Sequence, residues 1–182
     1  VPEVILNQLY QFTQLQDTFG IILLALVEGV PRVMSLKTTL QHFVDFRHDV
    51  VVRRTEFELK EAEARAHILE GLKIALDNID EVIKIIRGSK NPAQAKEGLM
   101  STFDLSEIQS QSILEMRLQK LTSLEVDKVV EEYKAIIKTI ANLKGILDSR
   151  AQRMNIIKSE LREIQDQYGD ERRTEIVPLS LI

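Results

Sequence analysis

The chain has 182 residues, of which 44% are hydrophobic and only 5% aromatic, and it contains neither Trp nor Cys. The missing Cys excludes disulfides and thiol chemistry, and the formal net charge of −4 excludes a strong bulk attraction to nucleic acid or acidic lipid. No apolar run reaches the ~20 residues that a membrane helix needs, so we expect a cytoplasmic protein that has no contact with a membrane.

Residues 1–35 predict a base segment that consists of a short helix and a β-hairpin. Apolar residues between 4 and 15 fall on one side of a helix. A long apolar run, the turn residues Glu28-Gly29 and a second extended run predict strands at about 18–27 and 31–36. A buried helix is the alternative for the apolar run, but a Gly and a Pro flank it and favour the strands.

Residues 36–70 predict one long descending helix. Ser35 is placed to cap its first turn, and neither Gly nor Pro interrupts it before Gly71. A helix of this length extends about 50 Å. At Gly71 we expect the helix to end, to bend or to continue with a kink. Apolar residues recur every seventh position and predict its seam: Leu36, Phe43, Val50, Phe57 and Ala64.

Residues 71–123 lie between this helix and the next long one, and they predict a small globular tip of short helices. Asn91-Pro92 combines a capping residue with Pro at the first helical position. Capping boxes at 106–109 and 122–125 predict two further helix starts, the first of them for a helix that ends at about Gln119.

Residues 124–147 carry the clearest heptad pattern of the chain and predict a helix of about 36 Å. Such a narrow apolar face needs a partner helix, and 36–70 is the natural one. The seam positions are all apolar or Tyr: Val126, Val129, Tyr133, Ile136, Ile140, Leu143 and Leu147.

Asp148-Ser149 breaks the heptad phase, so the ascending part, 124–168, is predicted to contain a second helix after the break. Gly169 is expected to end it as a left-handed cap. Residues 169–182 then return to the base as a polar loop and a short strand. The predicted fold class is mainly α: a long antiparallel two-helix coiled-coil arm with a small helical globular tip and a short β-hairpin at the base.

The sequence offers no candidate catalytic, cofactor-binding or metal-binding residue. His42, His48 and His67 are spaced too widely for two of them to share one helix face as a metal pair. Glycine-rich phosphate loops and HExxH patterns are absent. Tyr133 and Tyr168 occupy seam positions and are expected to pack in the core.

Two groups of residues are candidates for interactions. Near the base, Arg47, Arg53 and Arg54 either form ordinary helix ion pairs or face the phosphates of DNA. In the tip, one apolar strip can serve the tip's own core, but so small a tip needs more apolar burial than it finds alone, which favours a homodimer. The candidate dimer residues are Ile113, Leu114, Arg117, Leu118, Leu121 and Thr122.

Several motifs, in order, closely resemble the A subunits of bacterial type IIA topoisomerases, DNA gyrase more than topoisomerase IV. Individually the motifs are weak, but together they cover nearly all of 8–176. The matching stretches are TQLQ at 13–16, FG at 19–20, VRRT at 52–55, FEL at 57–59, AHILEG at 66–71, NID at 78–80, QSIL at 111–114, RLQKLT at 117–122 and YGDERRTEI at 168–176.

The resemblance implies the coiled-coil arm and the terminal globule that form the exit gate, or C-gate, of such an enzyme. There, two tips meet as a dimer, and the transported duplex leaves between them during ATP-dependent strand passage. DNA and the gyrase B subunit are the implied partners, and ATP and Mg act elsewhere in the holoenzyme. No Tyr of this chain lies in the family's active-site motif, so the chain alone is expected to be inactive.

Two other interpretations remain open at this stage: a purely structural coiled-coil dimeriser, and a helical hairpin that binds nucleic acid through Arg47, Arg53 and Arg54. The chain begins without an initiator Met, and its last residues are apolar. On this basis we expect a fragment of a longer polypeptide.

Overall fold

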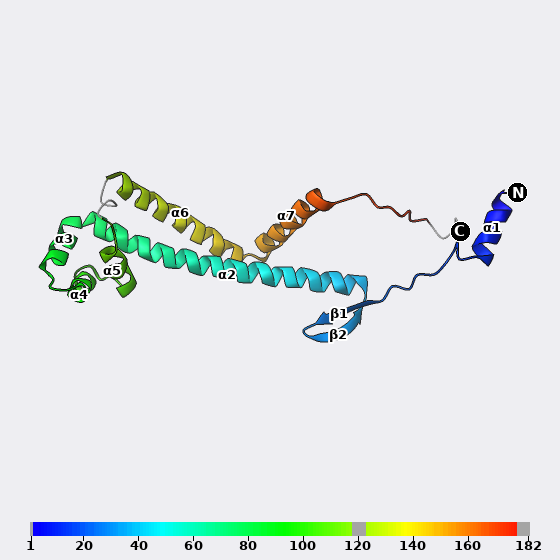
Figure 1. Ribbon diagram of the computed structural model, residues 1–182, viewed down its shortest axis with the longest axis horizontal. Helices are drawn as coiled ribbons and strands as arrows, with labels where there is room; N and C mark the ends of the chain where they lie inside the picture. Colours follow the sequence, from blue (N-terminus) through cyan, green and yellow to red (C-terminus); the bar gives the residue numbers. More distant parts are fainter. Residues whose placement is uncertain (1, 118–122, 178–182) are drawn as a thin grey trace. The chain divides into compact units, whose positions relative to one another are not determined.

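In a computed structural model that describes residues 2–117 and 123–177, the chain is mainly helical and has one two-stranded sheet (Figure 1). This confirms the predicted fold class. The chain divides into two units, Val1–Arg47 and His48–Ile182, and the long helix α2 (Leu36–Asp77) belongs to both. Among the described residues, no helix has the length and apolarity required to cross a membrane.

The first unit contains α1 (Pro2–Phe12), β1 (Leu23–Val27), β2 (Val30–Met34) and the beginning of α2. The predicted hairpin is confirmed, although both strands are shorter than expected. Its two strands are antiparallel, and the register pairs Val27 with Val30 across a two-residue turn.

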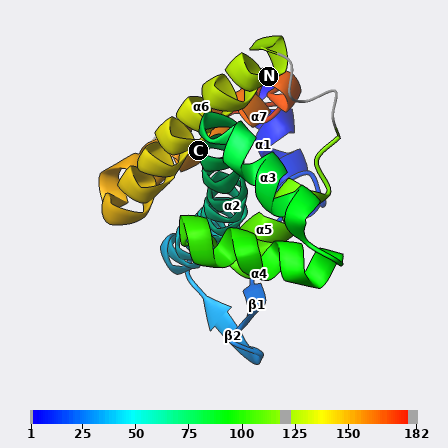
Figure 2. The same ribbon diagram turned by 90° about the vertical axis from the view of Figure 1, so that its left-hand side faces the viewer.

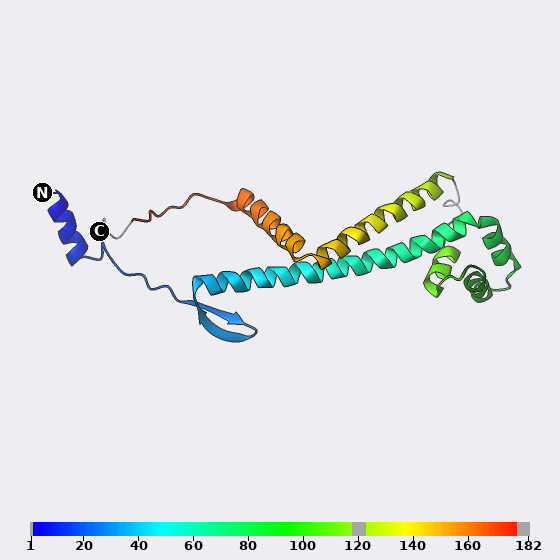
Figure 3. The same ribbon diagram turned by 180° about the vertical axis from the view of Figure 1, so that it is seen from behind.

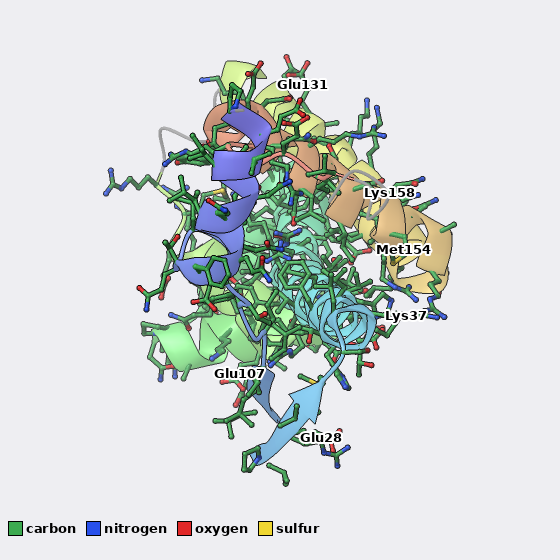
Figure 4. All side chains as sticks on the ribbon, turned by 90° about the vertical axis from the view of Figure 1, so that its right-hand side faces the viewer. Glu28, Lys37, Glu107, Glu131, Met154 and Lys158 are labelled. Atoms are coloured by element: carbon green, nitrogen blue, oxygen red, sulfur yellow. The ribbon has the colours of Figure 1, made fainter. Side chains whose placement is uncertain are left out.

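The turn itself explains why the hairpin closes at this point. Both central residues have positive φ, 52° at Glu28 and 79° at Gly29, which is the combination that a type I′ hairpin turn requires. Gly29 adopts this conformation without steric penalty. Figure 4 labels Glu28 at the turn between the two strands.

Helix α2 begins where the sequence predicts but does not end near Gly71. Ser35 Oγ accepts a hydrogen bond from the Thr38 backbone N–H at 3.3 Å, so the predicted cap is confirmed. Of the outcomes expected at Gly71, the helix continues and runs on to Asp77. Glycine serves there to admit a neighbouring helix, as described below, and does not break the helix.

The seam predicted along α2 is also wrong. Phe57 was placed in it, yet its side chain is 66% exposed. The buried stripe has the same periodicity but is filled mostly by small side chains, which allow helix axes to approach closely. It consists of Val51, Thr55, Ala62, Ala66 and Leu69. Apolarity alone pointed to the larger residues on other faces of the helix.

Helices α6 (Ser123–Asp148) and α7 (Arg150–Tyr168) follow the tip, and the break predicted between them is confirmed (Figure 3). All seven predicted seam residues of α6 are buried or half-buried, with Val129 and Leu143 the most enclosed. Ser149 Oγ accepts from the Gln152 N–H at 3.3 Å and caps α7.

The end of α7 differs from the prediction in three respects. Tyr168, which is expected to pack in the core, is 77% exposed. Gly169 has φ of −67° and ψ of 133°, so it is extended and not the left-handed cap that was expected. Its N–H still satisfies the Gln165 carbonyl at 2.7 Å. The strand expected after it does not form within 169–177.

Ion pairs between the described residues join α2 to α6 and α7. They are Arg65–Glu132 at 2.6 Å, Glu63–Lys144 at 2.8 Å and Arg54–Glu160 at 2.6 Å. As the α2 number falls, the partner number rises, so the helices are antiparallel. Exposed pairs of this kind contribute ~0–1 kcal/mol each, so the buried seam supplies most of the attraction.

The tip contains α3 (Ile79–Gly88), α4 (Pro92–Phe103) and α5 (Glu107–Leu114), gathered beside the end of α2 (Figure 2). The helix starts predicted at Asn91 and Ser106 are confirmed, because Asn91 caps α4 and the full capping box forms at the start of α5. The capping box predicted at 122–125 begins outside the described residues. Helix α5 ends earlier than predicted. The core of the tip draws residues from each of these helices and from α6: Leu69, Leu72, Ala75, Val82, Leu99, Leu105, Ile113 and Val129.

Candidate functional site

The structure separates the six predicted dimer residues into three groups. Ile113 is only 3% exposed and belongs to the core of the tip itself. Leu114 is half-buried against that core, and Arg117 is exposed. Leu118, Leu121 and Thr122 lie outside the described residues. Of the residues described, Leu114 and Arg117 are therefore the ones in reach of a partner.

An apolar groove of about 580 Å³ lies beside Leu114. Helix α3 provides most of its lining, and Met116 completes it after the end of α5. Ile83 and Ile86 are 38% and 37% exposed, which leaves much of each side chain accessible. The lining residues are Ile79, Val82, Ile83, Ile86, Arg87, Ile113, Leu114 and Met116.

The α3 side of this groove was missing from the sequence prediction. A signal for it existed, because 72–86 has a broader apolar face than one core requires. With Val82 in the core at 2% exposure and Ile83 beside it partly exposed, the face serves both the core and the surface. The groove thus extends the predicted tip surface from α5 onto α3.

Helix α5 packs very closely against α2. A Cβ placed on Gly71 would lie 2.7 Å from both Cβ and Cγ of Gln109, so only glycine fits there. The Gln109 side chain in turn donates to the His67 carbonyl at 2.8 Å and accepts from the Ser106 N–H at 2.9 Å. The side chains of α5 that face α2 are therefore held by polar contacts as well as by packing.

Ser110 is the one buried side-chain polar group without a hydrogen-bond partner among the described residues. Its side chain is fully enclosed, at 0% exposure. An unpaired buried hydroxyl costs about 1–3 kcal/mol, so it opposes the folding of the tip.

We expect Ser110→Ala to raise the free energy of unfolding by about 1 kcal/mol, because it removes the unpaired hydroxyl and improves helix propensity. Denaturant unfolding measures the change. Ser112→Ala is the matched control on the same helix, since Ser112 Oγ already donates to the Ile108 carbonyl at 2.9 Å. A larger gain in the control than in Ser110→Ala would show that the Ser110 hydroxyl has a partner.

One ion pair joins α4 to α5. Lys96 Nζ lies 2.7 Å from Glu107 Oε1, and this hydrogen bond, followed by the lysine's charge, holds the pKa of the Glu107 carboxyl below its usual value. Glu107 also lies in the first turn of α5, where a negative charge is favourable.

The three arginines proposed to face DNA have different surroundings. Arg54 is bound to Glu160 at 2.6 Å, as the ion-pairing interpretation predicts. Arg53 is exposed, and Arg47 is half-buried. Among the described residues, no group of three His, Asp or Glu is arranged to hold a metal ion.

Arg54→Ala is expected to lower the free energy of unfolding by up to about 1 kcal/mol, because the ion pair with Glu160 at a half-exposed site is lost. Arg53→Ala, the adjacent exposed arginine, is the control and should change stability by less than about 0.5 kcal/mol. Urea unfolding of both variants decides this. Equal losses would mean that the Arg54–Glu160 bond adds nothing.

Comparison with known proteins gives consistent matches over nearly the whole chain. A family model that describes the A subunits of DNA gyrase and topoisomerase IV matches residues 1–162. The DNA gyrase A subunit of Clostridium acetobutylicum is 58% identical over 173 residues, which are 95% of this chain and 21% of that protein.

Two further relatives agree. The DNA gyrase A subunit of Halalkalibacterium halodurans is 55% identical over 173 residues, 95% of this chain and 21% of the relative. The DNA gyrase A subunit of Deinococcus deserti is 52% identical over 179 residues, 98% of this chain and 22% of the relative. The chain therefore spans about a fifth of the length of these curated relatives.

Proposed function

Because this chain belongs to the family of the A subunits of DNA gyrase and topoisomerase IV, we propose that it forms the arm of such an enzyme and that its tip forms the exit gate. Two tips meet there as a homodimer, and the transported duplex leaves when they part. The supporting observation is the apolar groove at the tip, with Ile83 and Ile86 accessible beside Leu114.

A gate requires both reach and a contact that opens. The antiparallel pair of α2 with α6 and α7 supplies a stiff support made of few residues. A modest apolar contact is suited to reversible closure, because only interactions that differ between the open and closed states shift the equilibrium between them. The apolar groove and the two accessible isoleucines would form a contact of this modest size.

The activity that we propose for the whole protein is that of a type IIA topoisomerase, an isomerase that acts on DNA in the cytoplasm. We assign the DNA cleavage chemistry to other parts of the longer polypeptide and expect this chain alone to cleave no DNA. The B subunit of DNA gyrase is the proposed partner in the holoenzyme, where ATP and Mg act. The equivalent arm of topoisomerase IV is the alternative.

We also propose that the first unit contacts other parts of the longer protein. Its apolar side chains are unusually accessible for a folded segment, with Phe19 88% and Leu26 72% exposed. An isolated two-stranded hairpin is only marginally stable in water. A covering surface would stabilise it and anchor the arm.

Sedimentation equilibrium of the 182-residue chain tests the dimer, with circular dichroism as a check of folding. We expect a dimer at tens of micromolar and a shift towards monomer on dilution. A folded chain that stays monomeric would contradict both the exit gate and the purely structural dimeriser. Binding to duplex DNA that is lost with Arg47, Arg53 and Arg54 replaced would favour the nucleic-acid hairpin.

A further inference from the structure

A hydrogen-bond network connects α2 to the beginning of α5. His67 on α2 lies with its Nε2 2.7 Å from Ser106 Oγ, and with its Nδ1 3.3 Å from Gln109 Nε2. Gln109 Nε2 also donates to the His67 carbonyl at 2.8 Å. We call these three residues, His67, Ser106 and Gln109, the clasp.

The donor and acceptor roles in the clasp follow from backbone groups whose own role is fixed by their chemistry. The Ser106 backbone N–H can only donate, so the Gln109 oxygen must face it, at 2.9 Å. The Gln109 NH₂ group therefore faces His67, where it donates to the carbonyl. At Nδ1 the same NH₂ group needs an acceptor, so Nδ1 carries a lone pair.

The ring proton of His67 is then on Nε2, which donates to Ser106 Oγ. That oxygen also accepts from the Gln109 N–H at 3.2 Å, which is the capping bond of α5. One neutral tautomer of His67 thus satisfies the whole clasp.

Protonation of His67 is incompatible with this arrangement. A proton on Nδ1 would point at the Gln109 NH₂ group, so two donors would face each other. Turning the Gln109 amide over does not help, because its NH₂ group would then meet the Ser106 N–H, and its oxygen would meet the His67 carbonyl. In the first arrangement the clasp loses the 3.3 Å hydrogen bond between Gln109 Nε2 and His67 Nδ1. In the second it loses the bonds of Gln109 to the Ser106 N–H and to the His67 carbonyl.

The residues of the clasp differ in burial, and this difference makes the lost hydrogen bonds costly to the fold. His67 is exposed, so protons reach it from solvent. Gln109 is only 5% exposed and lies against Gly71, so water cannot readily replace its lost partner.

The charged groups around His67 come from three helices. On α2, Glu63 is one turn before it and is paired with Lys144, and Glu70 is one turn after it and exposed. On α5, Glu107 is held by Lys96 of α4. Glu63 and Glu107 thus already have cationic partners, and Glu70 is exposed.

We propose that the clasp is a proton-sensitive link in the tip, closed with neutral His67 and loosened when His67 is protonated. Protonation of His67 then frees the start of α5. Helix α5 leads directly to Arg117 and the groove, so loosening it weakens the tip contact. This last consequence rests on the proposed function, whereas the clasp itself does not.

Amide hydrogen exchange of the full-length protein that carries this chain tests the clasp, read on peptides of α5 at pH 7.5 and 5.5. After correction for intrinsic rates, exchange should be about tenfold faster at the lower pH. His67→Gln, which cannot be protonated, should remove this difference, and His42→Gln, outside the clasp, should keep it. Unchanged pH dependence in His67→Gln would overturn the proposal.

A second variant should reverse the direction in which amide exchange of α5 changes with pH. It also tests the clasp if His67→Gln does not fold. Gln109→Glu places a carboxylate that accepts from Ser106 N–H and from a protonated Nδ1. Its second oxygen also faces the His67 carbonyl, but that repulsion is present at both pH values, so α5 should still exchange more slowly at pH 5.5 than at 7.5. If exchange of α5 in this variant changed with pH in the same direction as in the unaltered protein, the clasp would be contradicted. Failure of the gate appears separately, as a monomeric tip at pH 7.5 in sedimentation of the 182-residue chain.

Discussion

Gly71→Ala is expected to lower the free energy of unfolding of the tip by about 2–4 kcal/mol. The added Cβ would lie 2.7 Å from two side-chain carbons of Gln109, far inside normal contact. Gln109 must then move, and it carries both the capping box of α5 and the contact with the His67 carbonyl. Denaturant unfolding measures the loss.

Helix propensity alone predicts the opposite sign, since replacing a mid-helix Gly by Ala gains about 1 kcal/mol. Gly145→Ala provides the control, because its nearest neighbour would be Gln152 Oε1 at an ordinary 3.7 Å. We expect this second variant to be stabilised by about 0.5–1 kcal/mol. Stabilisation of both variants would mean that α5 does not press on α2 at Gly71.

Ile83→Glu is expected to weaken the tip homodimer about 100-fold, because closing the dimer would bury a carboxylate in an apolar groove. Ile83 is 38% exposed and lines the groove, so the substitution should leave the fold of the monomer intact. Sedimentation at several concentrations gives the dissociation constants.

Ile108→Glu is the matched control for this prediction. Ile108 is 61% exposed on α5 of the same tip but is not part of the groove lining. The dimer should survive this change. If Ile108→Glu dissociates the dimer while Ile83→Glu does not, the contact surface lies on another face of the tip.

The sequence predicted the buried residues best in a helix that buries a single stripe. In α6, the heptad seam from Val126 to Leu147 is buried or half-buried throughout, because an apolar residue or Tyr fills every one of its positions. In α2, apolar residues occur on several faces, so periodicity selected Phe57 in place of the small residues that pack. Side-chain size matters at a close helix contact, and a binary pattern does not record it.

Local chemistry was also predictable, whereas contacts distant in sequence were not. The Ser106 capping box and the Asn91 cap involve residues three apart, and both were identified from spacing alone. The clasp joins His67 to a residue 42 positions away, and nothing in the sequence pairs them. The sequence marks Gly71 as unusual, but glycine is needed there because α5 packs against α2 at this point, and only the tertiary fold brings the two helices together.

The exit-gate proposal is tested most directly by locking the tips together in the full-length enzyme. Cysteines introduced at Arg117 or Ile83, in a chain that has none of its own, allow a cleavable cross-link between the two copies. We predict that the locked enzyme still cleaves DNA but no longer completes strand passage, and that cleaving the cross-link restores it. Continued strand passage with the tips locked would contradict the gate.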